Sequence, residues 1–296
     1  MLEKLIVFIG FGEAAYHIAK GLVTAGLANI TAYDVCKYDP KVGATIQARA
    51  KEIGVNLVDS VEEAVDSAKF ILSLTSAKVA VKVAEGALVL LESGQVFLDL
   101  NSAAPMTKKK IAALPRKEGV LVCDATVMGP VPINGYKVPI LLAGEGGKDF
   151  CEALTPYGMK LEVLDAPAGG AAAVKMLRSV FMKGLPQLLL ECMLAAEKYG
   201  VLDKIIDSVD KTIGGKNVRQ LANQLFTPTV VHATRRSSEM NEVISMLDDM
   251  GLESSMSSSS KSRLDSLAAM HIVDEIGIDA NLDYQEIIRL ILKHRS

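Results

Sequence analysis

The chain has 296 residues, half of them hydrophobic, and a formal net charge of −3. This length and composition suit one large or two medium domains with a sizeable core. The slight acidic excess leaves no basic surface for nucleic acid, so we expect no nucleic-acid partner. The four cysteines lie far apart without CxxC spacing, which predicts neither a disulfide framework nor a metal site.

The N-terminal region predicts a cytoplasmic protein. The first expected strand starts almost at the initiator Met, which leaves no room for a signal peptide. No continuous apolar run approaches the roughly 18 residues of a membrane span, so we expect no membrane partner.

The chain opens with a strand, a glycine turn and a helix. The apolar run 5–9 leads into Gly10, Phe11, Gly12, Glu13, Ala14 and Ala15. Gly10 permits a tight turn, Gly12 lets the backbone approach a pyrophosphate, and the helix start offers N–H groups and a positive dipole end. A second strand, 29–33, ends at Asp34, where a carboxylate can accept ribose hydroxyls. The segment predicts a dinucleotide site, and the alternative is a plain βα turn in a flavodoxin-like sheet.

Strands and helices alternate through the first half. We expect strands at 5–9, 29–33, 70–75, 96–99, 120–124 and 139–143, and helices at 13–24, 42–52, 61–66, 77–91 and 107–114. The alternation predicts an α/β, Rossmann-type doubly wound sheet with its ligand crevice at the carboxyl ends of the strands. There we expect Leu74, Thr75 and Asn101 to line the cofactor. A plain turn role for Thr75, and a helix-cap role for Asn101 and Ser102, stay open.

After residue 165 the alternation stops. A long helical pattern covers 171–198, where we expect a bend at Pro186, and further helices fit 202–211, 217–225, 228–250 and 286–294. The serine run 254–260 predicts a surface loop. We therefore expect a dinucleotide-binding domain over 1–165 and an all-helical substrate and dimerisation domain over 166–296. Its long apolar helices predict a homodimer.

The start of the long helix carries a second group of candidates. Lys175 and Ser179 are four residues apart and share a face, and Lys183 lies on the same stripe two turns on. The neighbours of Lys175 are apolar, so desolvation should lower its pKa toward neutrality, as a general acid or base requires. The alternative is a lysine that snorkels at a helix edge.

Four motifs, in this order, resemble the β-hydroxyacid dehydrogenase family, which includes 3-hydroxyisobutyrate and 6-phosphogluconate dehydrogenases. They are GxGxxA at 10–15, DxNSxxP at 99–105, DAxV at 124–127 and GGxxxxK at 169–175. The segment 232–243 resembles the helical C-terminal domain of a phosphogluconate-dehydrogenase-like branch. The resemblance implies that Gly10, Gly12 and Asp34 hold NAD or NADP, that Lys175 is catalytic and that Ser102 lies beside nicotinamide and substrate.

Two departures from the family pattern predict a different substrate. Met128 stands where the family has a serine that anchors a carboxylate, and Ser179 stands where it commonly has an asparagine. The candidate substrate residues are Met128, Gly129, Lys183, His232 and Arg236. His232 and Arg236 share a helix face with Glu239. This face is either a salt-bridged surface or an anion-recognising face that replaces the missing serine.

Together these features predict an NAD(P)-dependent dehydrogenase. It would move a hydride between nicotinamide and the hydroxyl or keto carbon of a small polar, hydroxy-acid-like substrate. Lys175 would act as general acid or base, with Ser102 and Ser179 holding the alcohol oxygen. Asp34 favours NAD, because a 2′-phosphate would meet a like charge, and Lys37 tempers that preference. The alternatives are a non-catalytic dinucleotide sensor and an imine-reducing or decarboxylating enzyme on the same scaffold, although Lys175 weighs against imine reduction.

Overall fold

The computed structural model describes residues 4–295, and the chain divides into two compact units, Met1–Val180 and Phe181–Ser296. Strand–helix alternation ends just before the predicted boundary at residue 165. The first unit continues into the following helix because Ala171, at its start, packs against Leu141 and Ala143 of the sheet.

The first unit is built on one eight-stranded sheet of order β3-β2-β1-β4-β5-β6-β7-β8. Its strands are β1 (Lys4–Ile9), β2 (Thr31–Tyr33), β3 (Asn56–Val58), β4 (Ala68–Ser73), β5 (Val96–Asp99), β6 (Leu121–Val127), β7 (Ile140–Gly144) and β8 (Leu161–Val163). β6 and β7 pair antiparallel, and the other neighbouring strands pair parallel. The predicted doubly wound α/β sheet is confirmed.

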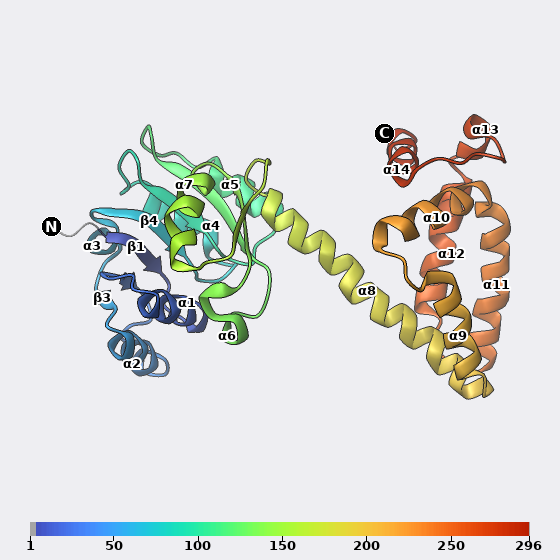
Figure 1. The fold of residues 1–296 in the computed structure, drawn as a ribbon, viewed down its shortest axis with the longest axis horizontal. Helices are drawn as coiled ribbons and strands as arrows, with labels where there is room; N and C mark the ends of the chain where they lie inside the picture. The colour runs from blue at the N-terminus through green and yellow to red at the C-terminus, as the bar shows by residue number, and fades with distance from the viewer. Residues whose placement is uncertain (1–3, 296) are drawn as a thin grey trace. The chain divides into compact units, whose positions relative to one another are not determined.

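Helices cover both faces of this sheet (Figure 1). They are α1 (Glu13–Thr24), α2 (Gly43–Ile53), α3 (Val61–Val65), α4 (Ala80–Leu88), α5 (Pro105–Ala112), α6 (Val131–Asn134) and α7 (Gly147–Leu154), with short 3₁₀ turns η1 (Gly135–Lys137) and η2 (Thr155–Tyr157). Side chains alternate along β1, as the pleat requires. Ile6 and Phe8 join the core under α1, α2 and α7, whereas Val7 and Ile9 join the core under α3, α4 and α5.

The second unit is all-helical, as predicted. Helix α8 (Gly170–Tyr199) runs from the first unit into the second, followed by α9 (Leu202–Ile213), α10 (Val218–Val231), α11 (Ala233–Asp249), α12 (Ser255–Ala268), α13 (Ile272–Ile276) and α14 (Tyr284–Lys293). Val230, Ile272 and Ile287 are the buried centre of one of its apolar clusters. The single helix expected over 228–250 is wrong, because His232 separates α10 from α11.

The serine run is a helix, not the predicted surface loop. α12 begins at Ser255, and the carboxylate of Glu191 accepts the backbone N–H groups of Met256 and Ser257 at 2.7 and 2.8 Å. The hydroxyl of Ser257 donates to the same carboxylate at 2.6 Å. A carboxylate at this position satisfies N–H groups that a helix start leaves without an intrahelical partner.

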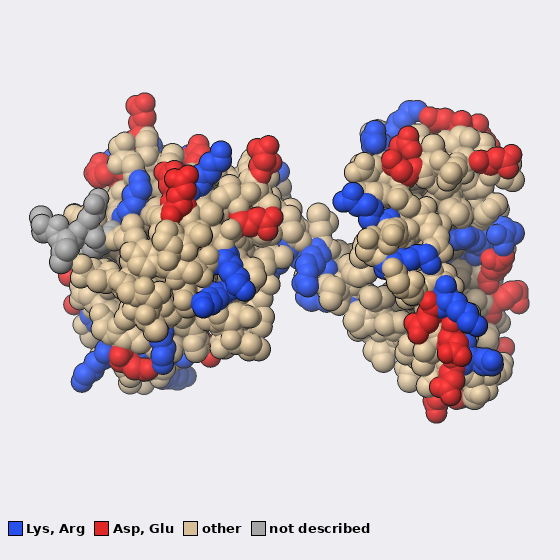
Figure 2. All heavy atoms as spheres, in the orientation of Figure 1, with Lys and Arg blue, Asp and Glu red and all other residues tan. Residues whose placement is uncertain are grey.

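Helix α8 exposes a large apolar surface. By length and composition it could cross a membrane, with a window of mean hydropathy 1.2 that is 11% buried. The window tolerates up to two charged residues, whereas the sequence expectation concerned a continuous apolar run, so the absence of a membrane partner stays a prediction. Elsewhere, charges of both signs are interspersed over the face of each unit shown in Figure 2.

Candidate active site

The turn after β1 has the backbone that a dinucleotide site needs. Gly10 adopts φ +91° and donates its N–H to the carbonyl of Tyr33 at 2.8 Å. A Cβ at Gly10 would lie 2.4 Å from the carbonyl oxygen of Leu74. The turn therefore requires glycine there, both for its left-handed backbone and for the close approach of β4.

Gly12 meets a different requirement. It precedes α1 with φ −73°, and no described atom lies within 4 Å of a Cβ built on it. The fold itself therefore does not demand glycine at this position. The open space faces the first turn of α1, where Glu13 and Ala14 lie and where helix N–H groups lack intrahelical partners. An opening of this kind fits the pyrophosphate of a dinucleotide, whose close approach a side chain would block.

Two other predicted residues of this turn have structural roles. Phe11 is fully buried in the core, edge-to-face with Phe8, so its side chain does not face the crevice. Its backbone N–H donates to Asp34 Oδ2 at 2.6 Å, and the N–H of Cys36 donates to Asp34 Oδ1 at 2.8 Å. Asp34 therefore braces the turn, and each of its carboxylate oxygens retains a lone pair for a ribose hydroxyl. Lys37, expected to temper the preference for NAD, forms an ion pair with Asp59 at 2.6 Å.

Asn101 joins the carboxyl ends of β4 and β5. Its Oδ1 accepts the N–H of Thr75 at 2.7 Å, and its Nδ2 donates to Ser73 Oγ at 3.1 Å and to Asp99 Oδ1 at 2.5 Å. The side chain is buried and its polar atoms are engaged. The helix-cap alternative for Asn101 and Ser102 is wrong, because Ala104 occupies the N-cap of α5 without a side-chain cap. Asn101 therefore shapes the crevice as a brace.

Lys175 and Ser102 meet at this edge of the sheet. The Nζ of Lys175, on α8, donates to Ser102 Oγ, in the loop after β5, at 3.0 Å. Partial burial lowers the pKa of Lys175, and the positive charge of Lys108 lowers it further. Its ammonium is thereby disfavoured, in the direction that a proton acceptor needs. Its assignment as the catalytic base stays a prediction.

The hydroxyl of Ser179 is used within the helix. Its Oγ donates to the backbone carbonyl of Lys175 at 3.1 Å. That bond takes its one proton and leaves lone pairs that can only accept. A substrate that needs a donor from Ser179 therefore has to break this contact.

The candidate substrate-binding residues are divided between the two units. Met128, after β6, packs against the cluster of Leu141, Ala143 and Ala171, and Gly129 beside it is exposed. In the second unit, Lys183 lies on α8 and His232 lies between α10 and α11. Their roles stay predictions.

Arg236 lies on α11 of the second unit and donates to Thr229 Oγ1 at 2.9 Å. Glu239 pairs with Arg235 through an exposed ion pair. Arg235, Arg236, Glu239 and Arg263 line an open groove of about 780 Å³. The Arg235–Glu239 pair agrees with the salt-bridged surface, and the anion-recognising face stays a prediction.

The structure contains a buried ion cluster, formed by Asp99, Lys108 and Asp124, that was not predicted from the sequence. The side chain of Lys108 is 1% exposed, and its Nζ lies 2.9 Å from Asp99 Oδ2 and 3.3 Å from Asp124 Oδ1. The run of three lysines at 108–110 is typical of a solvent-exposed helix face. The usable signal is that two acids, Asp99 at the end of β5 and Asp124 within β6, are register partners on neighbouring strands, which calls for a cation between them.

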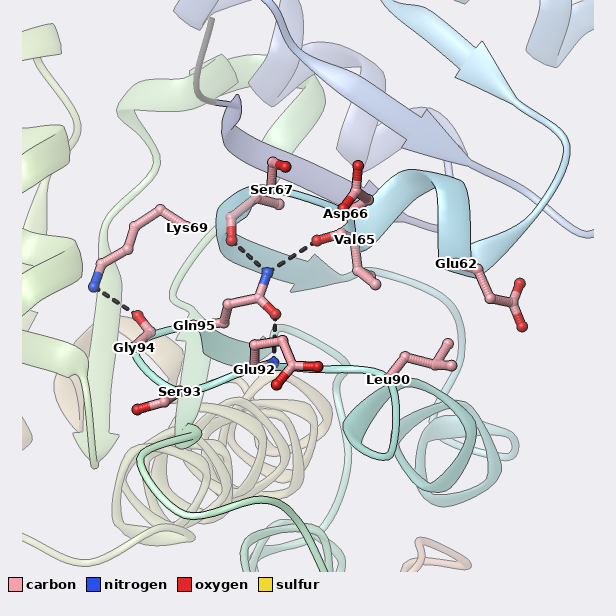
Figure 3. Close-up of a pocket in the computed structure, with 11 residues that line it drawn as sticks. Glu62, Val65, Asp66, Ser67, Lys69, Leu90, Glu92, Ser93, Gly94 and Gln95 are labelled. Carbon is pink, nitrogen blue, oxygen red and sulfur yellow. Dashed lines mark hydrogen bonds between the residues drawn. The ribbon is translucent and has the colours of Figure 1, made fainter. Parts of the chain in front are cut away.

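A large hollow lies at the opposite edge of the sheet, at the amino ends of β4 and β5. It measures about 830 Å³ and is lined by Lys69, Gly94 and Gln95 among others. Figure 3 shows Gln95 donating to the carbonyl of Val65 and Lys69 donating to that of Gly94. Gln95 also donates to the carbonyl of Ala68. Ligands of doubly wound sheets bind at the carboxyl ends of the strands, so we do not place the cofactor in this hollow.

Comparison with known proteins agrees with the geometry of the first unit. Residues 5–157 match the NAD binding domain of 6-phosphogluconate dehydrogenase, and residues 196–267 match a domain of unknown function. The first match spans more than half of the chain. The chain belongs to the β-hydroxyacid dehydrogenase-like family.

Solved structures of this family and fold cover nearly all of the chain. A conserved hypothetical protein from Sinorhizobium meliloti is 35% identical, with 99% of this chain and 97% of that one covered and a TM-score of 0.67. A conserved protein described as structurally similar to 3-hydroxyacid dehydrogenases is 28% identical, with 88% and 96% covered and a TM-score of 0.63. An imine reductase from Aspergillus terreus in complex with NADPH4 shares the fold, at 14% identity, 98% and 99% coverage and a TM-score of 0.72.

The match to an NAD binding domain and the relative that is structurally similar to 3-hydroxyacid dehydrogenases support an NAD(P)-dependent oxidoreductase. The residues present also fit the cofactor. Gly12 leaves open the space in front of α1, and Asp34 keeps lone pairs at the position of the ribose hydroxyls.

Proposed function

We propose that this β-hydroxyacid dehydrogenase-like protein oxidises the hydroxyl carbon of a small polar, hydroxy-acid-like substrate, or reduces the matching keto carbon. One observation carries the proposal. The amine of Lys175 lies 3.0 Å from Ser102 Oγ. Ser102 follows β5, whose carboxyl end lies at the same edge of the sheet as the carboxyl end of β1, where the glycine turn begins. A proton acceptor and a hydroxyl therefore converge where the cofactor crevice opens.

In the proposed reaction, Lys175 transfers the proton and Ser102 positions the substrate oxygen. In oxidation, neutral Lys175 accepts the proton of the substrate hydroxyl, and in reduction its ammonium returns it. Ser102 Oγ holds the same oxygen by a hydrogen bond and keeps it within reach of Nζ. A bound nicotinamide would supply the hydride acceptor or donor, held by the turn at Gly10 and Gly12 and by Asp34.

We infer that NAD is preferred over NADP. The carboxylate of Asp34 stands at the end of β2, where a 2′-phosphate would meet a like charge. The nearby cation, Lys37, is paired with Asp59 and is thus partly neutralised. The imine reductase complex with NADPH4 shares the fold at 14% identity and sets no preference for this chain.

The test combines a substrate panel with one substitution. The purified protein is assayed with NAD⁺ and NADP⁺ against hydroxy acids, and with NADH and NADPH against keto acids and cyclic imines. Lys175→Met should lower turnover by about 10²- to 10⁴-fold with cofactor affinity retained. Arg178→Met, on the same helix, serves as the matched control. Full turnover in Lys175→Met would overturn the role of Lys175, and turnover of imines alone would replace the hydroxy-acid assignment.

We also propose that the protein is a cytoplasmic homodimer formed through α8. Several large apolar side chains of this helix are strongly exposed, among them Leu190 at 53% and Leu194 at 58%. Burial of such side chains against a second copy removes apolar area from water. Light scattering should give twice the chain mass for the native protein, and Leu190→Lys with Leu194→Lys should give the monomer. A native monomer would contradict the proposal.

A further inference from the structure

The two partners of the Lys175–Ser102 contact are anchored on the same buried ion cluster. Ser102 follows Asp99 by three residues, and Lys175 follows Ala172 by three residues. Asp99 belongs to the cluster, and Ala172 is hydrogen-bonded to it. The distance between Nζ and Oγ therefore depends on how this cluster joins the end of β5 to the start of α8.

Asp124 forms the connection to α8. Its Oδ2 accepts the backbone N–H groups of Gly169 and Ala172 at 3.1 and 3.0 Å, and its side chain is fully buried. Gly169 directly precedes α8 and Ala172 lies in its first turn, where N–H groups lack intrahelical partners and the helix dipole favours a negative charge. A residue of β6 thus fixes the start of the helix that carries Lys175.

Lys108 forms the connection to Ser102. Its Nζ donates to the backbone carbonyl of Asp99 at 2.6 Å and lies 2.9 Å from Asp99 Oδ2. Among the described residues, no aligned donor reaches that oxygen, so the charge of Lys108 is its compensation. Since Asp99 and Asp124 are register partners, the two carboxylates would repel each other without this cation.

A buried ion cluster of this kind is expected to contribute little net free energy to the stability of the fold. Buried ion pairs can often be replaced by well-packed apolar residues without loss of stability, because desolvation offsets the attraction between the charges. Here Asp99 ends β5 three residues before Ser102, and Asp124 holds the start of the helix that carries Lys175. The positive charge of Lys108 also lowers the pKa of Lys175, and Lys108 is itself paired with Asp99 on β5 and Asp124 on β6. These facts point to a role in the site.

We propose that Lys108, held between Asp99 and Asp124, is a positioning residue that keeps Ser102 and the start of α8 at the spacing that Lys175 needs. The inference rests on the proposed function of Lys175 as acid or base. The side chain of Lys108 is 1% exposed, so it would touch neither substrate nor cofactor. It acts on the reaction through the two elements that it joins.

The first test needs no substrate. Trace labelling with acetic anhydride across a pH series, read by peptide mass spectrometry, gives the pKa and reactivity of each lysine. In Lys108→Met, both the lost positive charge and a loosened α8 raise the pKa of Lys175. Lys108→Gln is the second variant, because it keeps a donor for the carbonyl of Asp99 and is therefore better able to fold. Lys110→Gln, on the exposed face of α5, is the control and should leave Lys175 unchanged.

The second test uses the reaction once a substrate is found. Misplacing Lys175 relative to Ser102 should lower kcat by about 10- to 100-fold in Lys108→Met and less in Lys108→Gln, with the Kd for cofactor unchanged. Asp124→Asn, which weakens the connection to α8, should lower kcat in the same way. A folded Lys108 variant with native Lys175 labelling and native kcat would overturn the proposal. If Lys175→Met keeps its turnover, the proposed function fails, and the labelling result still decides whether Lys108 controls Lys175.

Discussion

Asp34 Oδ2 accepts the backbone N–H of Phe11 at 2.6 Å and so ties the end of β2 to the glycine turn. The residue expected to recognise the ribose therefore also holds the loop against which the pyrophosphate would lie. This double role links coenzyme choice to loop stability. The effect of a substitution at Asp34 on coenzyme choice is therefore measured as the ratio of the dissociation constants for NADPH and NADH, since a loosened loop would weaken the binding of both coenzymes together.

We predict that the native protein binds NADH at least about tenfold more tightly than NADPH. Asp34→Asn should bring the two dissociation constants together, because the amide no longer repels a 2′-phosphate and still offers one acceptor to the turn. Fluorescence titration measures both constants. Asp66→Asn, at the other edge of the sheet, should keep the native ratio. Tighter binding of NADPH by the native protein would contradict the prediction.

Gly10 and Gly12 should respond in opposite ways to the same substitution. In Gly10→Ala the new Cβ meets the Leu74 carbonyl at 2.4 Å on a left-handed backbone, so the melting temperature should fall markedly. In Gly12→Ala the Cβ meets no described atom, so stability should stay native. That Cβ would project into the space for the pyrophosphate, and NADH affinity should drop by about tenfold or more.

Thermal melts and NADH titrations of Gly10→Ala and Gly12→Ala test these two predictions. Native NADH affinity in Gly12→Ala would show that the open space before α1 does not receive the pyrophosphate. A native melting temperature in Gly10→Ala would show that β4 yields to the new Cβ.

The glycine turn could be predicted from the sequence because its signals are local. Gly10, Gly12 and Asp34 lie within one βαβ unit, and their spacing reflects one strand, one helix and the next strand. The short strands β3 and β8 were missed, because three residues give little alternation and, unlike the equally short β2, they are marked by no motif such as the acid that follows the glycine turn.

The missed features depend on contacts that are distant in sequence. Lys108 is buried only because parallel pairing brings Asp99 and Asp124 into register. The serine run forms α12 with help from Glu191, which lies more than sixty residues earlier in the chain. Serine by itself favours caps and turns over helix interiors, so the local signal favoured a loop.

The pH dependence of the reaction should reveal Lys175. Burial lowers its pKa below the ordinary range of lysine, and the neutral amine is the form that accepts a proton. For oxidation, kcat/KM should therefore rise with pH and level off above the pKa of Lys175. For reduction, which needs the ammonium, kcat/KM should fall through the same range.

Initial rates in both directions over one pH series check this prediction. In Lys108→Gln the inflection should move to higher pH, because a positive neighbour of Lys175 is lost. Oxidation that declines as pH rises through this range would contradict the role of Lys175 as base.

Glu191 should contribute to the stability of the second unit through α12. Its carboxylate accepts two backbone N–H groups and the hydroxyl of Ser257, so Glu191→Ala leaves three donors at the helix start without that partner. We expect a loss of about 1–2 kcal/mol in the free energy of unfolding, as for other helix caps. Glu197→Ala, an exposed position on the same helix, should change it by less than about 0.5 kcal/mol. Urea denaturation followed by circular dichroism gives both values. Equal effects of the two substitutions would mean that α12 forms without the cap, through packing alone.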